Sequence, residues 1–192
     1  PLPNVSDEEL LNLVSPWIAK RHHDVEVDHD SVAWKLNPTK EELHRMRAYY
    51  YANVEMIDNQ VGNILNSLEE RGNMDNTIVI FTSDHGDNLG DHGLIQKWAP
   101  YEEVTRVPLI ISAPKRFKSE RNISAMVQLF DLAPTILEWA GVKPNPTFEA
   151  VSLNSALEGS KFDGRDHVFC EQAGDVNTVS YTHLTLPTIS VV

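Results

Sequence analysis

The feature that most constrains the fold is a long amphipathic segment that begins at Thr39. Thr39 and Glu42 form a capping box just after Pro38, which is a typical helix start. Apolar side chains then recur every three or four residues, at Leu43, Met46, Tyr50, Val54, Ile57, Val61, Ile64 and Leu68. Gly72 offers a C-terminal stop. The pattern predicts one helix over residues 40–71, far longer than an average helix, and it needs a large surface to cover.

Two short apolar runs follow this helix and predict strands. Residues 76–83 are rich in β-branched side chains and predict a central strand of the parallel type, buried on both faces. Residues 107–112 predict a second strand, with Pro108 near its start, where proline is tolerated. Asp131 should cap a helix that runs to Ala140, and residues 167–171 should form a last strand. This order of elements predicts part of an open α/β sheet.

Composition narrows the classes of function. The 192 residues, 41% of them hydrophobic, allow one sizeable core. The net charge of −12 argues against a nucleic-acid partner or an anionic membrane, so any bound anion must be held by a metal or by single cations. No apolar run approaches the roughly 20 residues of a membrane span. The chain opens with Pro-Leu-Pro, and we expect its true N-terminus to lie upstream.

Several other features have ordinary interpretations. Cys170 is the single cysteine and lies in an apolar pattern, which indicates a small buried hydrophobe rather than a nucleophile. Three N-terminal histidines follow no periodicity and indicate a solvated loop, namely His22, His23 and His29. Residues 179–192 carry no charge and look like a translated adaptor. We therefore expect one domain portion over 1–178 and a non-native tail over 179–192.

Residues 84–93 contain the tripeptide Asp-His-Gly twice. The first copy, Asp84-His85, directly follows a predicted strand, and ligands of open α/β sheets bind where strands end. Gly86 would let the backbone turn sharply away. The second copy, Asp91-His92, lies in a loop between glycines and consists of ordinary turn residues. The position of each copy therefore favours the first as a metal-binding pair.

Three linked segments, residues 50–72, 77–114 and 129–142, resemble the sulfatase family of the alkaline phosphatase superfamily. They occur in the family's order, and the match runs from about Glu41 to Leu157. The Asp-His pair is similar to the branch that includes choline-sulfatase-like and iduronate-sulfatase-like enzymes, whereas most arylsulfatases have Asp-Asn there. The resemblance implies part of an alkaline-phosphatase-like sandwich, with a mostly parallel sheet flanked by helices and truncated at the N-terminus.

The resemblance also implies a role for individual residues. Asp84 and His85 become ligands of the active-site divalent cation, and Lys97 becomes the cation that grips the sulfate and assists the departing oxygen. Fixed positive charge at that point would stabilise the charge that develops as a sulfate ester breaks. The second copy is expected to support the loop that carries Lys97. Arg106 and Asp131 are expected to be structural.

The family's nucleophile is a formylglycine made from a Cys/Ser-x-Pro-x-Arg motif, and no such motif occurs in this chain. The upstream Asp pair that completes the family's metal site is also absent. We therefore expect the C-terminal portion of a sulfatase catalytic domain, with half a metal site and no activity alone. The family implies Ca²⁺ or Mg²⁺, while an imidazole ligand leans toward Mn²⁺ or Zn²⁺.

Two alternatives remain open beside a sulfatase that cleaves a small-molecule or carbohydrate sulfate ester. A phosphonate or phosphate ester hydrolase of the same superfamily would act on an anion of the same tetrahedral geometry, with Mn²⁺ favoured for the phosphonate. A degenerate member could bind a sulfated glycan without cleaving it. By family analogy the protein is expected to be periplasmic or secreted. The sequence leaves the particular ester and the oligomeric state open.

Overall fold

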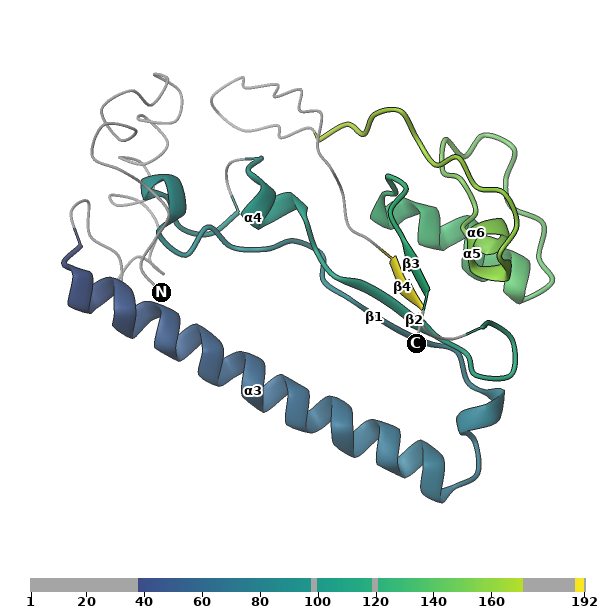
Figure 1. Ribbon diagram of the computed structural model, residues 1–192, viewed down its shortest axis with the longest axis horizontal. Helices are drawn as coiled ribbons and strands as arrows, with labels where there is room; N and C mark the ends of the chain where they lie inside the picture. The colour runs from purple at the N-terminus through teal and green to yellow at the C-terminus, as the bar shows by residue number, and fades with distance from the viewer. Residues whose placement is uncertain (1–37, 98–99, 119–120, 171–188, 192) are drawn as a thin grey trace. The chain divides into compact units, whose positions relative to one another are not determined.

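The computed structural model describes residues 38–97, 100–118, 121–170 and 189–191 (Figure 1). Contacts within the chain divide it into two compact units. The helical unit comprises Pro1–Ser67, His85–Val104 and Cys170–Tyr181. The sheet unit comprises Leu68–Asp84, Thr105–Phe169 and Thr182–Val192. Among the described residues, no helix is both long enough and apolar enough to cross a membrane.

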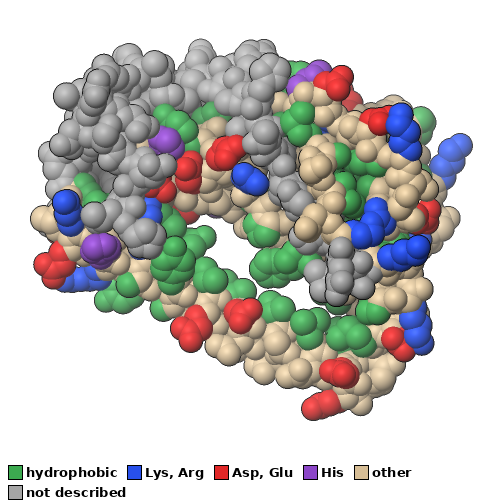
Figure 2. Space-filling view, viewed as in Figure 1, with side chains coloured by type: hydrophobic (Ala, Val, Ile, Leu, Met, Phe, Trp, Pro, Cys, Tyr) green, Lys and Arg blue, Asp and Glu red, His purple; other side chains and the backbone are tan. Residues whose placement is uncertain are grey.

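The long helix α3 runs over Lys40–Glu70, as the apolar periodicity predicts. The Thr39 N–H donates to the Glu42 carboxylate at 2.9 Å, and the Glu42 N–H donates to Thr39 Oγ1 at 3.2 Å, so the predicted capping box is present. Gly72, in the left-handed conformation with φ 66°, ends the helix. Apolar side chains along α3 remain partly exposed, including Val54 at 45% and Ile64 at 61% (Figure 2).

The helical unit contains two further short elements in its described part. The turn of 3-10 helix η3 spans Asp91–Gly93, and the short helix α4 spans Glu102–Thr105. Leu94, Ile95 and Val104 are buried in this region.

In its described part, the sheet unit contains a four-stranded mixed sheet. Its strands are β1 (Val79–Thr82), β2 (Leu109–Ser112), β3 (Arg121–Ile123) and β4 (Ile189–Val191), in the spatial order β1-β2-β4-β3. β1 pairs antiparallel with β2, with Val79 opposite Ser112, whereas β2 and β4 are parallel and β3 and β4 antiparallel. The predicted α/β class is confirmed. The described sheet is mixed rather than mostly parallel, and β1 is a half-buried edge strand of it rather than the predicted central one.

Helices and turns complete the sheet unit. They are η2 (Met74–Asn76), η4 (Leu129–Asp131), α5 (Leu132–Trp139) and α6 (Asn154–Glu158). The helix predicted to end at Ala140 is therefore present as α5. β4 belongs to the segment 179–192 that the sequence sets apart, and the non-native origin of that segment stays a prediction.

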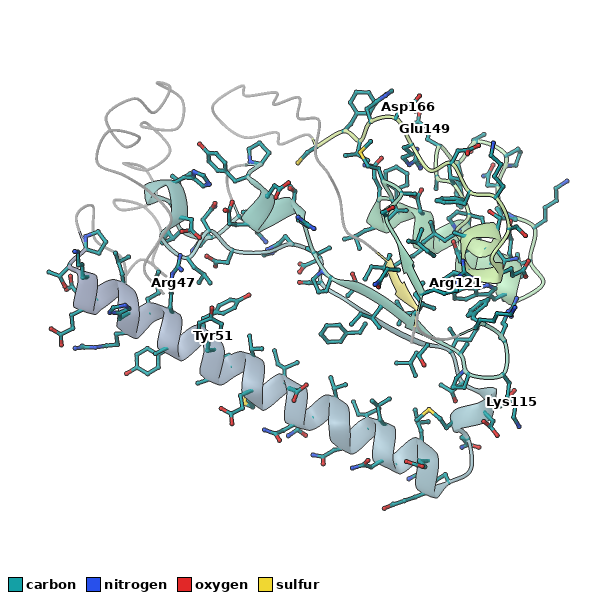
Figure 3. All side chains as sticks on the ribbon, in the orientation of Figure 1. Arg47, Tyr51, Lys115, Arg121, Glu149 and Asp166 are labelled. Atoms are coloured by element: carbon teal, nitrogen blue, oxygen red, sulfur yellow. The ribbon has the colours of Figure 1, made fainter. Side chains whose placement is uncertain are left out.

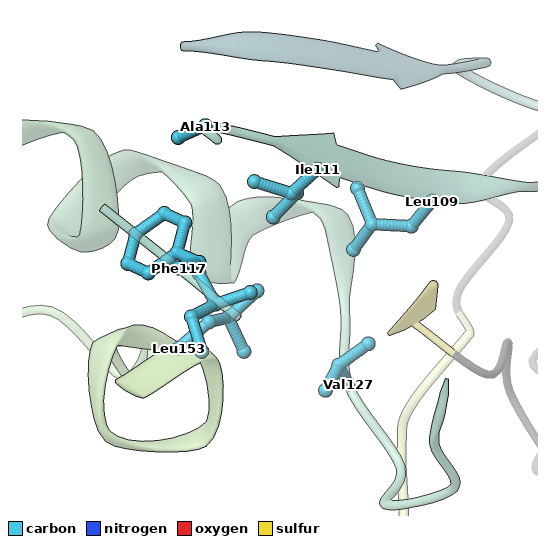
Figure 4. Close-up of a cluster of buried hydrophobic side chains, with 7 residues drawn as sticks. Leu109, Ile111, Ala113, Phe117, Val127 and Leu153 are labelled. Atoms are coloured by element: carbon cyan, nitrogen blue, oxygen red, sulfur yellow. The ribbon is translucent and has the colours of Figure 1, made fainter. Parts of the chain in front are cut away.

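The core of the sheet unit lies between β2 and the segments that follow it (Figure 4). It contains Leu109, Ile111, Ala113, Phe117, Val127, Leu153 and Leu157. β2 contributes every second residue because alternate side chains of a strand point to the same face. Each fully buried aliphatic side chain in such a core contributes about 1.5–3 kcal/mol.

The strand predicted at residues 167–171 is wrong. Residues 167–170 are irregular, although Val168 is 3% exposed and Phe169 62% exposed, as in a strand with one buried face. The Phe169 carbonyl accepts a hydrogen bond from the Gln128 side chain at 3.1 Å. A side chain thus occupies an acceptor that a neighbouring strand would use.

Candidate active site

The first Asp-His-Gly copy begins two residues beyond the end of β1. Asp84 is exposed, and the Ser83 hydroxyl lies 3.5 Å from its Oδ1. Asp84 is the last residue of the segment Leu68–Asp84 of the sheet unit, and His85 is the first residue of the segment His85–Val104 of the helical unit. The predicted position at the carboxyl end of a strand is therefore confirmed, although the strand is not fully buried.

The two ring nitrogens of His85 have different surroundings. Nδ1 lies 2.8 Å from the Gly86 carbonyl oxygen, which can only accept a hydrogen bond. We therefore assign the ring proton to Nδ1, which leaves a lone pair on Nε2. Lys97 Nζ lies 2.9 Å from Nε2. The structure thus places the predicted catalytic lysine directly beside one of the predicted metal ligands.

Gly86 is required for close packing. Its φ is not positive, so the need for glycine here does not come from a left-handed conformation. Its N–H donates to the Val104 carbonyl at 2.7 Å. A Cβ at this position would lie 1.9 Å from the Glu103 carbonyl oxygen, so no larger residue fits without moving the backbone. This contact holds the chain next to His85 against α4.

The second copy forms the η3 turn, and its aspartate is tied to α3. Arg47 of α3 forms an ion pair with Asp91, with 2.9 Å between a guanidinium nitrogen and the carboxylate Oδ1 (Arg47 is labelled in Figure 3). The Arg47 Nε also donates to the Leu89 carbonyl at 3.0 Å. The Arg47 residue is 8% exposed, so this contact is shielded from water.

His92 packs within the same loop. Its ring stacks on Tyr101 with 3.7 Å between the ring centroids and 7° between the planes. Its Nε2 lies 3.3 Å from a carboxylate oxygen of Glu103. These contacts match the supporting role predicted for the second copy.

The remaining residues considered from the sequence lie outside this cluster. Asp131 is 1% exposed, and its carboxylate accepts hydrogen bonds from the Gln128 and Val151 N–H groups and pairs with Arg165. Asp131 is therefore structural, as expected. Burial raises the pKa of the Cys170 thiol, which disfavours the nucleophilic thiolate. The three N-terminal histidines lie outside the described residues.

Sequence reasoning missed several residues that shape this loop. Arg47, Asp87 and Asn88 make its main polar contacts. Arg47 lies 42 positions before its acceptor Leu89, and no local pattern links the two. Asp87 and Asn88 resemble ordinary turn residues. Two adjacent Asx residues beside a proposed ligand pair nevertheless indicate side chains that can hold the backbone of the loop.

The donor set suits part of a divalent-metal site. Carboxylate and imidazole are side-chain types that bind divalent metals, and an Nδ1 held by a carbonyl, as in His85, is the usual way to orient a ligating imidazole. Within the described part of the chain, no three His, Cys, Asp or Glu side chains come together to hold a metal. By residue type, Asp84 and His85 are therefore compatible with two ligands of a larger ligand set.

Known proteins resemble most of this chain. The model of the Sulfatase family matches residues 6–142. The chain is 44% identical over 109 residues to N-acetylglucosamine-6-O-sulfatase from Bacteroides thetaiotaomicron, over 57% of this chain and 20% of that protein.

Two solved structures extend the match. A protein in complex with its substrate D-glucosamine-2-N,6-O-disulfate aligns with TM-score 0.66 and 32% identity, over 87% of this chain and 33% of that chain. Phosphonate monoester hydrolase from Silicibacter pomeroyi aligns with TM-score 0.75 and 27% identity, over 93% of this chain and 36% of that chain.

The chain spans about a fifth to just over a quarter of the length of the curated relatives that it matches. The family match nevertheless covers well over half of the chain, and it includes α3, β1, the loop that carries Lys97, β2 and α5. The chain therefore belongs to the sulfatase family.

Proposed function

We propose that the protein containing this chain is a sulfuric ester hydrolase that cleaves a sulfate monoester. The observation that carries the proposal is the 2.9 Å contact between Lys97 Nζ and His85 Nε2. This contact places the proposed sulfate-binding cation and a proposed metal ligand side by side, as such a reaction needs. The family match supports the same reaction class.

In the proposed site, Asp84 and His85 hold a divalent cation, with Ca²⁺ or Mg²⁺ preferred and Mn²⁺ the main alternative. When bound, the cation would polarise the ester and neutralise its negative charge. His85 contributes Nε2, and the Gly86 carbonyl fixes the orientation of its ring.

Lys97 would bind the sulfate and stabilise the charge that develops on the departing oxygen. Its ammonium carries three donors, so when a cation takes the Nε2 lone pair of His85, Lys97 can turn these donors to the anion. The attacking group would be a formylglycine that lies outside this chain. The Asp-His pair supports a place in the choline-sulfatase-like and iduronate-sulfatase-like branch.

For the substrate, we propose a sulfated carbohydrate. The support is the N-acetylglucosamine-6-O-sulfatase relative and the solved complex with a disulfated glucosamine. A periplasmic or secreted location is proposed on family analogy alone. The likeness to phosphonate monoester hydrolase keeps phosphonate monoesters as a second candidate substrate class.

The test compares an aryl sulfate with the matching aryl phosphonate monoester on the full-length protein that carries this chain, with formylglycine formation ensured. We expect the higher kcat/KM on the sulfate. Lys97→Ala should lower kcat by about 10²–10³, as removal of one transition-state donor does in other enzymes. Lys115→Ala is the matched control, because Lys115 is an exposed lysine that pairs with Asp75 on the surface (Figure 3).

Three outcomes would count against the proposal. A higher kcat/KM on the phosphonate would assign the protein to the second candidate class. Binding of sulfated glycans without turnover of either ester would indicate a non-catalytic member. Equal loss of activity in the Lys97 and Lys115 variants would remove Lys97 from the site.

A further inference from the structure

Asp87 and Asn88 surround the backbone of Gln96, the residue just before Lys97. Asp87 Oδ1 accepts hydrogen bonds from the Leu89 N–H at 2.8 Å and from the Gln96 N–H at 3.0 Å. The Gln96 carbonyl accepts from the Asn88 N–H at 3.0 Å and from the Asn88 side-chain amide at 2.8 Å. Both backbone polar groups of Gln96 are therefore held by the two residues that follow Gly86.

Gln96 has a backbone conformation that needs such support. Its φ of 58° lies in the left-handed region, which is unfavourable for a residue with a Cβ. Leu89, the other residue that donates to Asp87, also has a positive φ, at 47°. Strained conformations of this kind persist where surrounding contacts fix them, and they are frequent near active sites.

The direction of Lys97 depends on Gln96, because the left-handed turn at Gln96 sets where the next Cα–Cβ bond points. Lys97 itself is exposed, and its Nζ still lies 2.9 Å from His85 Nε2. Asn88, by contrast, is fully buried. The residue that holds the Gln96 carbonyl therefore lies in the interior of the helical unit.

We propose that Asp87 is a positioning residue that, with Asn88, fixes Gln96 and so aims Lys97 at the substrate anion. The proposal rests on the catalytic role of Lys97 proposed above. A competing role for Asp87 is that of a further metal ligand, since it lies three residues after Asp84. Its Oδ1 already accepts two backbone hydrogen bonds, which favours the positioning role.

The two roles make opposite demands on the side chain. Positioning needs an oxygen at the Oδ1 position, and asparagine keeps that oxygen without the charge. Metal ligation favours the charged carboxylate over the neutral amide, and glutamate keeps the charge but moves the oxygens by one methylene. Asp87→Asn and Asp87→Glu are therefore a matched pair that separates geometry from charge, and Asp87→Ala removes both.

The experiment uses the full-length protein and two readouts. Hydrogen exchange followed by mass spectrometry measures protection of the Leu89 and Gln96 amides, and kcat and KM are measured with an aryl sulfate. We expect Asp87→Ala to accelerate exchange at both amides and to lower kcat by about 10²-fold, the cost of a misplacement near 1 Å. Asp87→Asn should keep protection and stay within about threefold of the parent kcat, while Asp87→Glu should be worse than Asp87→Asn.

Two results would overturn the proposal. Unchanged exchange in Asp87→Ala would show that the carboxylate does not hold Gln96. A glutamate variant more active than the asparagine variant would show that charge matters more than geometry. If Asp87→Ala does not fold, the asparagine and glutamate variants still decide. If the parent protein hydrolyses no sulfate ester, the proposed function fails, but the exchange measurement still tests the contact with Gln96.

Discussion

His85 and His92 occupy the same place in two copies of one tripeptide, but their surroundings differ. His85 has one nitrogen against a backbone carbonyl and the other against Lys97. His92 is stacked on Tyr101 and lies beside Glu103. An imidazole oriented by a backbone carbonyl is typical of a metal ligand, whereas a stacked ring beside a carboxylate mainly stabilises its loop. The local contacts therefore separate the two copies, which the tripeptides themselves do not.

The two histidines give a matched pair of variants. His85→Ala in the full-length protein should lower the affinity for its divalent cation by at least about tenfold, because a metal ligand is lost. His92→Ala should leave that affinity within about twofold and lower the free energy of unfolding by about 1 kcal/mol, the usual value of an aromatic contact. Calorimetric metal titration and chemical denaturation measure the two effects. A larger loss of metal affinity in His92→Ala would mean that the copies have the reverse roles.

At the scale of elements, α3 and the loop that carries Lys97 are joined by the Arg47–Asp91 pair. The two side chains are only 10% and 14% exposed, so removal of one leaves a largely buried charge without its partner. Arg47→Met should therefore lower the free energy of unfolding by about 3 kcal/mol, measured by urea denaturation of the full-length protein. Arg45→Met is the control on the same helix, because Arg45 pairs with Glu41 at the exposed surface.

A double-mutant cycle tests whether this loss comes from the pair itself. Arg47→Met combined with Asp91→Leu should be less destabilising than the sum of the two single variants, since neither buried charge is then left alone. Additive losses would show that the two residues stabilise the protein independently.

Elements differed in how far the sequence could predict them. α3 was predicted to within a residue or two at each end, because a local capping box and a long apolar periodicity define it. The strand at 167–171 was wrong, because alternating burial at Val168 and Phe169 does not require a partner strand. β1 was assigned to the wrong kind of pairing, since an apolar run carries no information about the direction of its neighbour.

The candidate site was predictable only in part. Lys97 and the first Asp-His copy were identified from the family resemblance and the strand end, and the structure brings Lys97 and His85 together. The contacts of Asp87 and Asn88 with Gln96 were not predictable, because they span eight or nine residues of a loop without periodicity. Left-handed conformations at Leu89 and Gln96 are also invisible in the sequence, since neither residue is glycine.

At the scale of the whole molecule, the chain contributes one part of the proposed reaction. It carries the lysine and two proposed metal ligands, while the formylglycine and the remaining ligands are proposed to lie elsewhere in a longer protein. Within the described residues no complete metal site is formed. Half a ligand set loses most of the advantage of chelation, so this chain alone should bind divalent cations weakly.

The most direct measurement is turnover of an aryl sulfate by this chain alone and by the full-length protein, each produced with the formylglycine-generating enzyme. For this chain alone we expect no turnover above the metal-only background, because the nucleophile that splits the reaction into two easier steps is missing. For the full-length protein we expect turnover whose kcat falls by about 10²–10³ in Lys97→Ala. Robust turnover by this chain alone would contradict the account, because it would show that the nucleophile lies within these 192 residues.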